Sequence, residues 1–399
     1  MKATASRRPI APGSGAFIAL IASLMAITAM STDINLPAIS AIAASLGGSL
    51  TMGQLTVTVF FMGFAVGQLV WGSLSDRTGR KPALLTGLAL YEVVTLGCAL
   101  ATSMEMLLIL RALQGWAAGA GSVLARAVIR DLFTGERMAR ALSLAMAAFV
   151  TAPIVAPTVG AFILSIAGWR WIFGFLALYG LLLLILATLF LDESLKVRNP
   201  HALRLGHLAR AFAAVFTDRH SRGWALVVVF LFGSLTVYLA NASAVLMEGY
   251  GMTPATFGGA FAAIAACSAV GNLINSRLVR HVSLPRLIRA ASLLTLLAAA
   301  AALWFALART DVWWLVGALG LFFTTFGLVA ANATTLALQP HATAAGAAAA
   351  ALGFAQTVIP AGLASVVAAF YDGTGAPMLA TMTALAAASW LLSLVAGKG

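Results

Sequence analysis

Residues 72–82 read GSLSDRTGRKP, a short run that holds one Asp, three cations and two glycines. Apolar stretches lie on either side of it, at about residues 52–74 and 82–101. Each stretch has the length of about 20 residues that a helix needs to cross a bilayer core. The run is therefore a tight connection between two membrane-spanning helices, and its charges can hold the two helix ends together through charge-assisted hydrogen bonds.

The composition of the whole chain also indicates a protein embedded in a lipid bilayer. Of its 399 residues, 61% are apolar and 9% are charged, against about 25% charged in an average soluble domain. The mean hydropathy is +0.99. These values exclude a cytosolic enzyme, a disordered chain and a fibrous chain, and they indicate an all-α integral membrane protein with many spans.

Hydropathy marks twelve apolar stretches, and a polar segment divides them six and six. They lie at about residues 15–38, 52–74, 82–101, 104–126, 140–162, 169–190, 224–247, 255–276, 284–307, 312–336, 344–370 and 376–396. We therefore expect an N-terminal six-helix bundle over 1–190, a cytoplasmic linker over 191–223 and a C-terminal six-helix bundle over 224–399.

The basic residues predict the orientation. With the N-terminus inside, the inner segments hold 21 of the 24 Lys and Arg residues, and loops rich in these residues stay in the cytoplasm. The formal charge of +12 therefore reflects topology and contact with anionic lipid of the inner leaflet rather than nucleic-acid binding. We expect both termini in the cytoplasm and an uncleaved first helix.

The residue types that catalysis and metal binding use are scattered. Cys98 and Cys267 lie inside apolar runs, and neither a disulfide framework nor a metal-ligand spacing is present. The five His residues fall singly in inner segments, and no P-loop occurs. The sequence therefore predicts no metal, no cofactor, no enzymatic activity and no use of ATP.

A shift of 199 residues aligns the two halves of the chain at equivalent places. It brings Gly271, Leu273, Asn275 and Arg280 onto Gly72, Leu74, Asp76 and Lys81. Such matches are what a parallel duplication of a six-helix unit produces.

Four segments resemble motifs of known transporters. The order of residues 72–82 closely resembles the signature loop of the major facilitator superfamily. RALQGWAAG at 111–119 and APIVAPTVG at 152–160 look like the fourth-span and fifth-span motifs of its drug:proton antiporters, although Ala156 and Ala161 stand where the antiporter motif has glycine. STDINLPA at 31–38 resembles the first-span segment of the Bcr/CflA multidrug exporters. The resemblance implies the major facilitator fold, with twelve transmembrane helices in two pseudo-symmetric six-helix bundles.

Two of these motifs suggest moving parts. A conformational latch is expected at Gly72, Asp76, Arg77, Gly79, Arg80 and Lys81; the alternative is an ordinary positive-inside loop. In the fifth span a kink is expected at Pro153, Pro157 and Gly160, because Pro157 removes a backbone donor and clashes with the preceding turn. The resemblance gives that segment a role in closing one side of the cavity, and the alternative is simple packing.

Three buried ionisable residues are candidates for proton coupling. A carboxylate in a span costs at least ~2.5 kcal/mol, so Asp33 is a functional candidate; the alternative is that it is solvated near the interface. Arg111 is predicted at similar depth, where it could pair with Asp33 or simply tie backbone carbonyls together. Glu92 lies ten residues into the third span and is the next candidate.

The predicted spans of the second half contain polar residues but no acidic ones. Tyr238, Asn241, Asn332 and Gln356 are the expected substrate-pocket residues, and hydrogen bonding between helices is the alternative for each.

Together these features predict a proton-coupled efflux transporter that exports a small amphipathic drug or metabolite by alternating access. The expected location is a bacterial inner membrane, and the expected partners are the small-molecule substrate, protons and anionic lipid, with the protein a monomer. A major facilitator symporter that imports a nutrient is the alternative, since a fold does not decide direction. A membrane enzyme or a channel is less consistent with scattered His residues and a six-plus-six repeat.

Overall fold

The computed structural model describes residues 10–199 and 212–396 of the chain. Within these ranges it contains twelve helices that are long and apolar enough to cross a membrane, and no β-strand. The predicted all-α fold with twelve spans is therefore confirmed. Residues 200–211 of the expected linker lie outside the described part.

Each half of the chain contributes six spans. The first half contains α1 (Gly15–Asp33), η1 (Leu36–Ala38), α2 (Ile39–Ser45), α3 (Leu50–Thr78), α4 (Arg80–Ala99), α5 (Met104–Leu132), α6 (Gly135–Ala167) and α7 (Trp169–Phe190). The second half contains α9 (Arg219–Ser243), η2 (Ala244–Gly249), α10 (Pro254–Leu278), α11 (Leu284–Leu307), α12 (Val312–Leu338), η3 (Gln339–Ala344), α13 (Ala345–Ala369) and α14 (Ala376–Val395).

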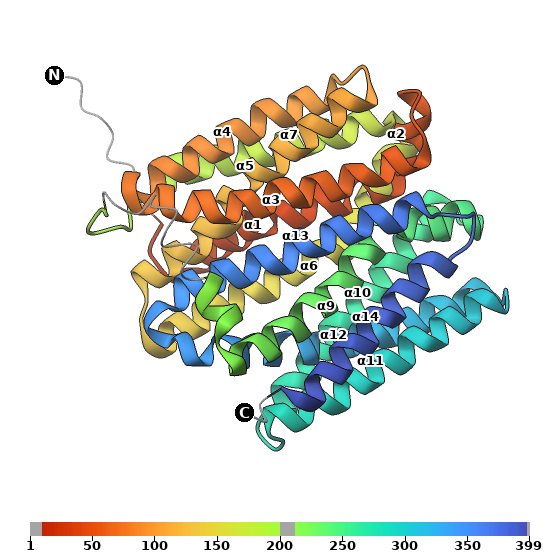
Figure 1. Cartoon of the computed structure of the whole chain (residues 1–399). Helices are drawn as coiled ribbons and strands as arrows, with labels where there is room; N and C mark the ends of the chain where they lie inside the picture. The colour runs from red at the N-terminus through yellow and green to blue at the C-terminus, as the bar shows by residue number, and fades with distance from the viewer. Residues whose placement is uncertain (1–9, 200–211, 397–399) are drawn as a thin grey trace.

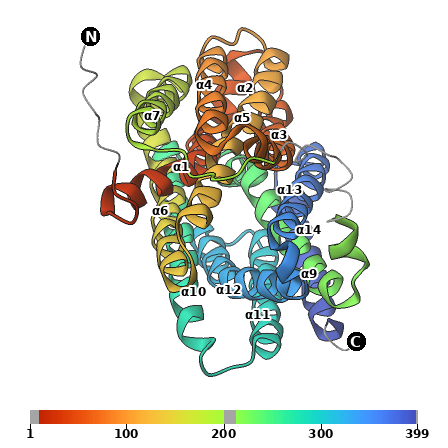
Figure 2. The ribbon, with the colours of Figure 1, turned by 90° about the vertical axis from the view of Figure 1, so that its left-hand side faces the viewer.

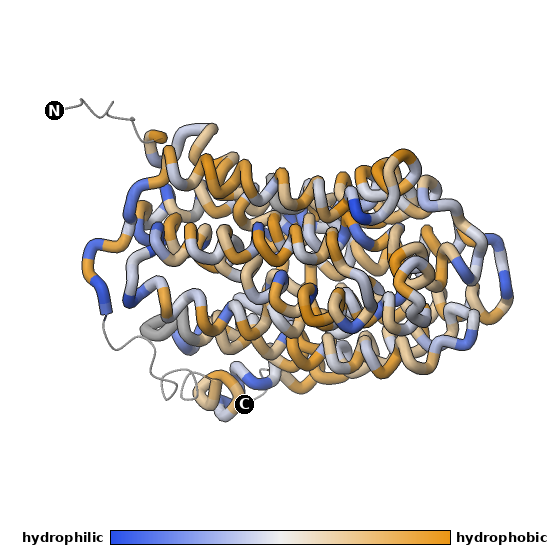
Figure 3. Tube along the Cα trace, turned by 90° about the horizontal axis from the view of Figure 1, so that it is seen from above, coloured by the Kyte–Doolittle hydropathy of each residue, from blue (hydrophilic) through white to orange (hydrophobic). Residues whose placement is uncertain are grey.

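The two halves form two bundles that meet along two pairs of helices. On one side α6 packs against α10, and on the other α3 packs against α13, as the views in Figures 1 and 2 both show. Hydrophobic residues dominate the helices, while hydrophilic residues gather in the connections at the two ends of the bundles (Figure 3). This distribution suits a protein whose middle lies in lipid.

The first span is longer than its hydropathy predicts, and it is broken. Helix α1 ends at Asp33, a single 3₁₀ turn follows, and α2 continues the span to Ser45. Pro37 causes the break locally, because it has no N–H to donate to the carbonyl of Asp33. The break places the carboxylate at a helix end inside the protein, where the backbone is no longer fully hydrogen-bonded.

Close backbone contact holds α3 against α5. A Cβ atom at Gly63 would strike the carbonyl oxygen of Ala112, and one at Gly115 would strike the carbonyl oxygen of Phe60. Only glycine allows helices to approach this closely. The second bundle repeats the arrangement, since a Cβ atom at Gly271 of α10 would strike the carbonyl oxygen of Thr324 in α12.

Candidate functional site

A cavity of about 710 Å³ lies between the two bundles. Its walls come from α1, α3, α5 and α6 of the first half and from α9, α10, α12 and α13 of the second. At one end its lining includes the exposed side chains of Arg126 and Arg130, near the end of α5. We call this end of the cavity the open end. The volume of the cavity is large enough for a small organic molecule.

The opposite end of the cavity is closed by contacts between the bundles. The Gln54 side-chain amide donates to Oδ1 of Asn241 over 3.0 Å. The Thr51 hydroxyl donates to the carbonyl of Ala368 over 3.4 Å, and a third contact joins α6 to α10 at Thr158. The cavity is therefore reached from one end only in this conformation, and we call the other the closed end.

Asp33 supplies the one acidic side chain of the cavity wall among the described residues. It is only 4% exposed, and its Oδ1 accepts a hydrogen bond from the neighbouring Thr32 hydroxyl over 2.9 Å. Hydroxyl donation leaves the group without a counter-charge. Asp33 is therefore held by a neutral hydrogen bond and not by an ion pair.

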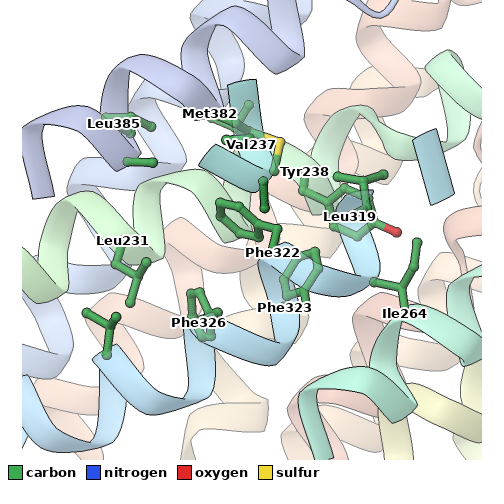
Figure 4. Close-up of a cluster of buried hydrophobic side chains, with 14 of the residues drawn as sticks. Leu231, Val237, Tyr238, Ile264, Leu319, Phe322, Phe323, Phe326, Met382 and Leu385 are labelled. Atoms are coloured by element: carbon green, nitrogen blue, oxygen red, sulfur yellow. The ribbon is translucent and has the colours of Figure 1, made fainter. Parts of the chain in front are cut away.

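Tyr238 of α9 lines the same cavity as Asp33. Its ring packs on Phe261 and Phe323, with centroids 5.6 Å and 5.0 Å away. Figure 4 shows Tyr238 together with Phe322 and Phe323 in a cluster of buried side chains. Its hydroxyl has no hydrogen-bond partner among the described residues. A buried unpaired hydroxyl is costly, so this one is available to a ligand.

Arg111 is buried against the end of α1, and it does not pair with Asp33. Its guanidinium donates to the carbonyl of Ser31 over 3.0 Å and to Oε1 of Gln114 over 2.6 Å, and it lies 4.6 Å from the ring of Phe60. Among the described residues, the ion pairs are both made by Arg80. Arg111 therefore does not pair with Asp33 in this conformation. It binds the Ser31 carbonyl instead, which is the alternative that the sequence left open.

A hydrogen-bonded network surrounds Arg111 and joins α1, α3, α4 and α5. Gln114 donates to the Thr95 hydroxyl over 2.9 Å, and the hydroxyls of Ser31 and Tyr91 are 2.7 Å apart. One guanidinium nitrogen of Arg111, Nη2, has no partner among the described atoms. The network fixes the broken end of α1 relative to α4 and α5, and it leaves one donor of the cation free.

Glu92 lies away from the cavity. Its Oε2 faces Gly180 of α7, at 3.0 Å from the position that a Cβ atom would take there, and Glu92 is absent from the described cavity lining. The structure therefore does not bring this residue together with Asp33.

The charged connection between α3 and α4 is organised by Arg80. Its guanidinium contacts Asp76 at 2.5 Å and Asp131 of α5 at 2.8 Å. Glu193 accepts from the backbone N–H groups of Arg80 and Lys81 over 2.9 Å and 3.2 Å. These contacts join the ends of α3, α4 and α5 to the start of the linker.

Two members of the expected latch differ from Arg80 in their surroundings. Gly79 has φ +111°, and a Cβ atom there would strike the Glu193 carboxylate, so only glycine suits this turn. Arg77 is exposed, and within the described part of the chain it makes no ion pair. The cluster ties helix ends together inside one bundle in this conformation and does not bridge the two bundles.

The segment with the antiporter-like motif lies at the closed end. Helix α6 is continuous through Pro153 and Pro157, and Pro153 lines the cavity. A Cβ atom at Gly160 would strike the carbonyl oxygen of Ile34, next to the break in α1. Gly258 of α10 lies close to the Pro157 carbonyl. The segment thus packs on α1 and α10 together, where the cavity ends.

Comparisons with known proteins agree with this arrangement. The model of the Major Facilitator Superfamily matches residues 21–369. This chain belongs to that superfamily. It is 31% identical to the uncharacterized MFS-type transporter YdgK of Bacillus subtilis, over 91% of this chain and 90% of that one. It is 30% identical to a bicyclomycin resistance protein homolog of Haemophilus influenzae, over 92% of each.

The fold is also that of a solved major facilitator structure. The partially occluded inward-open form of the xylose transporter XylE from E. coli matches with a TM-score of 0.75 at 14% identity, over 94% of this chain and 96% of that one. The resemblance to drug:proton antiporters of the Bcr/CflA group and the major facilitator fold, with its two six-helix bundles, are confirmed. The protein is a multi-pass membrane transporter.

The expected substrate-pocket residues of this major facilitator protein divide into two pairs. Tyr238 and Gln356 line the cavity. Asn241 instead bonds Gln54 and its own helix, and Asn332 bonds Asn275 over 2.7 Å. For Asn241 and Asn332 the expectation does not hold in this conformation, because neighbouring helices satisfy their amides.

Two cavity residues were not expected from the sequence. The predicted span ends at residue 126, so that Arg126 and Arg130 lie at and beyond its end, yet α5 continues to Leu132 and both side chains line the cavity. Their spacing of four was a usable signal, since it puts both on one helix face.

The contribution of the Arg80 contacts to stability can be measured. Arg80→Gln removes charge-assisted bonds to Asp76 and Asp131, and we expect it to lower the free energy of unfolding by roughly 2 kcal/mol. Thermal unfolding of the purified protein measures this change. Arg77→Gln, in the same connection but exposed, is the matched control and is expected to change stability by less than about 0.5 kcal/mol. Equal effects of the two substitutions would show that the Arg80 contacts add nothing.

Proposed function

We propose that this protein is a proton-coupled exporter, which moves a small amphipathic molecule out of a bacterial cytoplasm by alternating access. It lies in the inner membrane with both termini in the cytoplasm. The observation that carries the proposal is the position of Asp33: within the described residues it is the one carboxylate of the cavity between two bundles, placed beside the closed end.

The charge distribution supports the orientation. The open end of the cavity is the end at which Arg80, Lys81 and residues 191–199 meet. Connections rich in Lys and Arg stay in the cytoplasm, so the cavity here is open to the inside. A substrate enters from the cytoplasm and reaches the aromatic wall around Tyr238.

Alternating access then couples Asp33 to protons. Rocking of the bundles breaks the Gln54–Asn241 and Thr158–Gly258 contacts, which are single neutral hydrogen bonds of 3.0 Å and 3.4 Å and cost little to separate. Asp33 then faces the outside, takes a proton as substrate leaves, and releases it to the cytoplasm after the cavity reverses. One carboxylate carries one proton in each cycle.

Arg111 supplies the electrostatic control in this scheme. Arg111 is bonded to the carbonyl of Ser31, which is two residues before Asp33 in the sequence. Its free Nη2 can donate to the Asp33 carboxylate when α1 shifts. A nearby cation favours the ionised form of an acid. Movement of Asp33 toward or away from Arg111 therefore changes its proton affinity between the two conformations.

Export rather than import is supported by the relatives. A homolog named for bicyclomycin resistance shares 30% identity over nearly the whole length of both chains, and resistance by a transporter requires removal of the drug. The likeness to a xylose transporter at 14% identity concerns the fold, and a fold does not set direction. Import by symport is the competing function.

Everted membrane vesicles distinguish the two directions. Respiration acidifies their lumen, and a pH-sensitive dye reports the gradient while drugs and dyes are added outside. An antiporter admits the added compound and releases protons, so we expect a substrate to collapse the gradient of wild-type vesicles and not that of vesicles without the protein. Proton loss only from vesicles preloaded with the compound would show symport instead.

A further inference from the structure

The cavity wall carries positive charge toward its open end that the proposed proton cycle does not use. Arg126 and Arg130 both line the cavity from α5, and both side chains are exposed to it rather than folded into a network. Among the described residues, neither forms an ion pair. Two guanidinium groups one helical turn apart repel each other unless an anion lies between or beside them.

Asp33 is too far away to neutralise them. Arg111 contacts the backbone of Ser31, which places Asp33 near the level of Arg111. Arg126 lies fifteen residues further along α5, about 22 Å at 1.5 Å per residue. The cavity is therefore polarised along its length, with the carboxylate beside the closed end and the two cations toward the open end.

We infer that Arg126 and Arg130 form a subsite for the anionic group of the substrate, so that the protein exports amphipathic molecules that carry a carboxylate or sulfonate. This inference rests on the proposed function and names the substrate class of the same cavity. The guanidinium fork binds planar and tetrahedral anions through paired hydrogen bonds, which a hydrated ammonium does less well.

The rest of the wall suits the other end of such a molecule. Ser122 lies one turn from Arg126 on the same face of α5 and adds a hydroxyl, and Gln68 and Gln356 add amides from α3 and α13. Toward the closed end the wall becomes aromatic, with Phe64, Phe323 and the Tyr238 ring. An aromatic acid would place its charge at the arginines and its ring against this wall.

The charge of the substrate affects how strongly the membrane potential drives export. When a monovalent anion leaves and a proton enters, a net two positive charges move into the cytoplasm. When a neutral molecule leaves and a proton enters, the net movement is one positive charge. Both movements are favoured by a cytoplasm that is electrically negative. Export of the anion therefore depends more steeply on membrane potential than export of a neutral analogue.

Three probes with one ring system test the charge preference: 2-naphthoate, 2-naphthamide and 2-naphthyltrimethylammonium. Their binding to the purified protein in phosphatidylcholine nanodiscs is measured by titration. We expect naphthoate to bind at least ~10-fold more tightly than the other two. Equal affinities, or preference for the cation, would overturn the inference.

Substitutions locate the preference. Arg126→Gln and, separately, Arg130→Gln are expected to weaken naphthoate binding about 10-fold and to leave naphthamide within about 2-fold. Arg137→Gln, an exposed arginine of α6 away from the described cavity lining, is the matched control and should leave all three probes unchanged. The inference fails if both cavity variants bind naphthoate like wild type, or if they lose all three probes equally.

Two further measurements distinguish a lipid site from a substrate site, and binding from transport. Loss of naphthoate binding when phosphatidylglycerol replaces phosphatidylcholine would assign the arginines to a lipid headgroup and overturn the substrate proposal; unchanged binding supports it. In proteoliposomes, proton-coupled transport of naphthamide without anion preference would leave the proposed function and remove this inference. Anion preference in binding without proton-coupled transport of any probe would remove the proposed function alone.

Discussion

Asp33→Asn is expected to reduce substrate-driven proton movement at least ~100-fold, because it removes the one carboxylate of the described cavity wall and leaves no other group there to carry the proton. The side chain keeps its size and its contact with Thr32. Binding of a neutral substrate should therefore change by less than about 3-fold. Gradient collapse in everted vesicles measures the first effect, and titration of the purified protein measures the second.

The matched control is Glu105→Gln. Glu105 is an exposed acid in the first turn of α5, so its loss removes a carboxylate from the protein without touching the cavity. We expect wild-type proton movement from this variant. Normal coupling in Asp33→Asn together with its loss in Glu92→Gln would assign the proton to the α4–α7 interface and contradict the role given to Asp33.

The second large effect concerns the contact between α3 and α5. Alanine at Gly63 or Gly115 places a methyl group on a carbonyl oxygen of the facing helix. Backbone cannot move aside as a side chain can, so we expect each substitution to lower the free energy of unfolding by about 3 kcal/mol or more. Thermal unfolding in detergent and the amount of protein recovered from membranes measure this loss.

Two other helical glycines provide the comparison. A Cβ atom at Gly259 of α10 or Gly317 of α12 meets no heavy atom within 4 Å. Alanine there should leave stability unchanged or raise it by up to about 1 kcal/mol, since alanine favours a helix more than glycine does. If all four substitutions behaved alike, helix propensity rather than close packing would explain the glycines.

Much of the fold follows from local patterns. Twelve runs of about 20 apolar residues predict twelve spans, because no other structure satisfies the backbone in lipid. The signature at 72–82 predicts a tight connection, and the structure shows why: Gly79 needs positive φ, and Arg80 binds two carboxylates. Even the break after Asp33 has a local cause in Pro37.

The candidate site depended on contacts between distant segments, and local patterns predicted it less well. Asn241 and Asn332 are the residue types that a pocket uses, yet Gln54 and Asn275 satisfy them. Arg111 is the cation that the sequence placed at the depth of Asp33, yet it donates to the Ser31 carbonyl and to Gln114. Which polar group is already paired depends on the helix that faces it, and that helix can be more than a hundred residues away.

The sequence by itself determined that the protein spans a membrane, how many spans it has, its family and the carboxylate within the first span. Hydropathy, chain length and motif order are properties of contiguous residues. Only the tertiary structure decided which side chains share the cavity. It placed Asp33 and Tyr238 in one cavity and brought Arg126 and Arg130 into the wall of that cavity. The physical reason is that a cavity is enclosed by faces of eight helices from both halves, and their relative rotation is set by packing between helices rather than by any one segment.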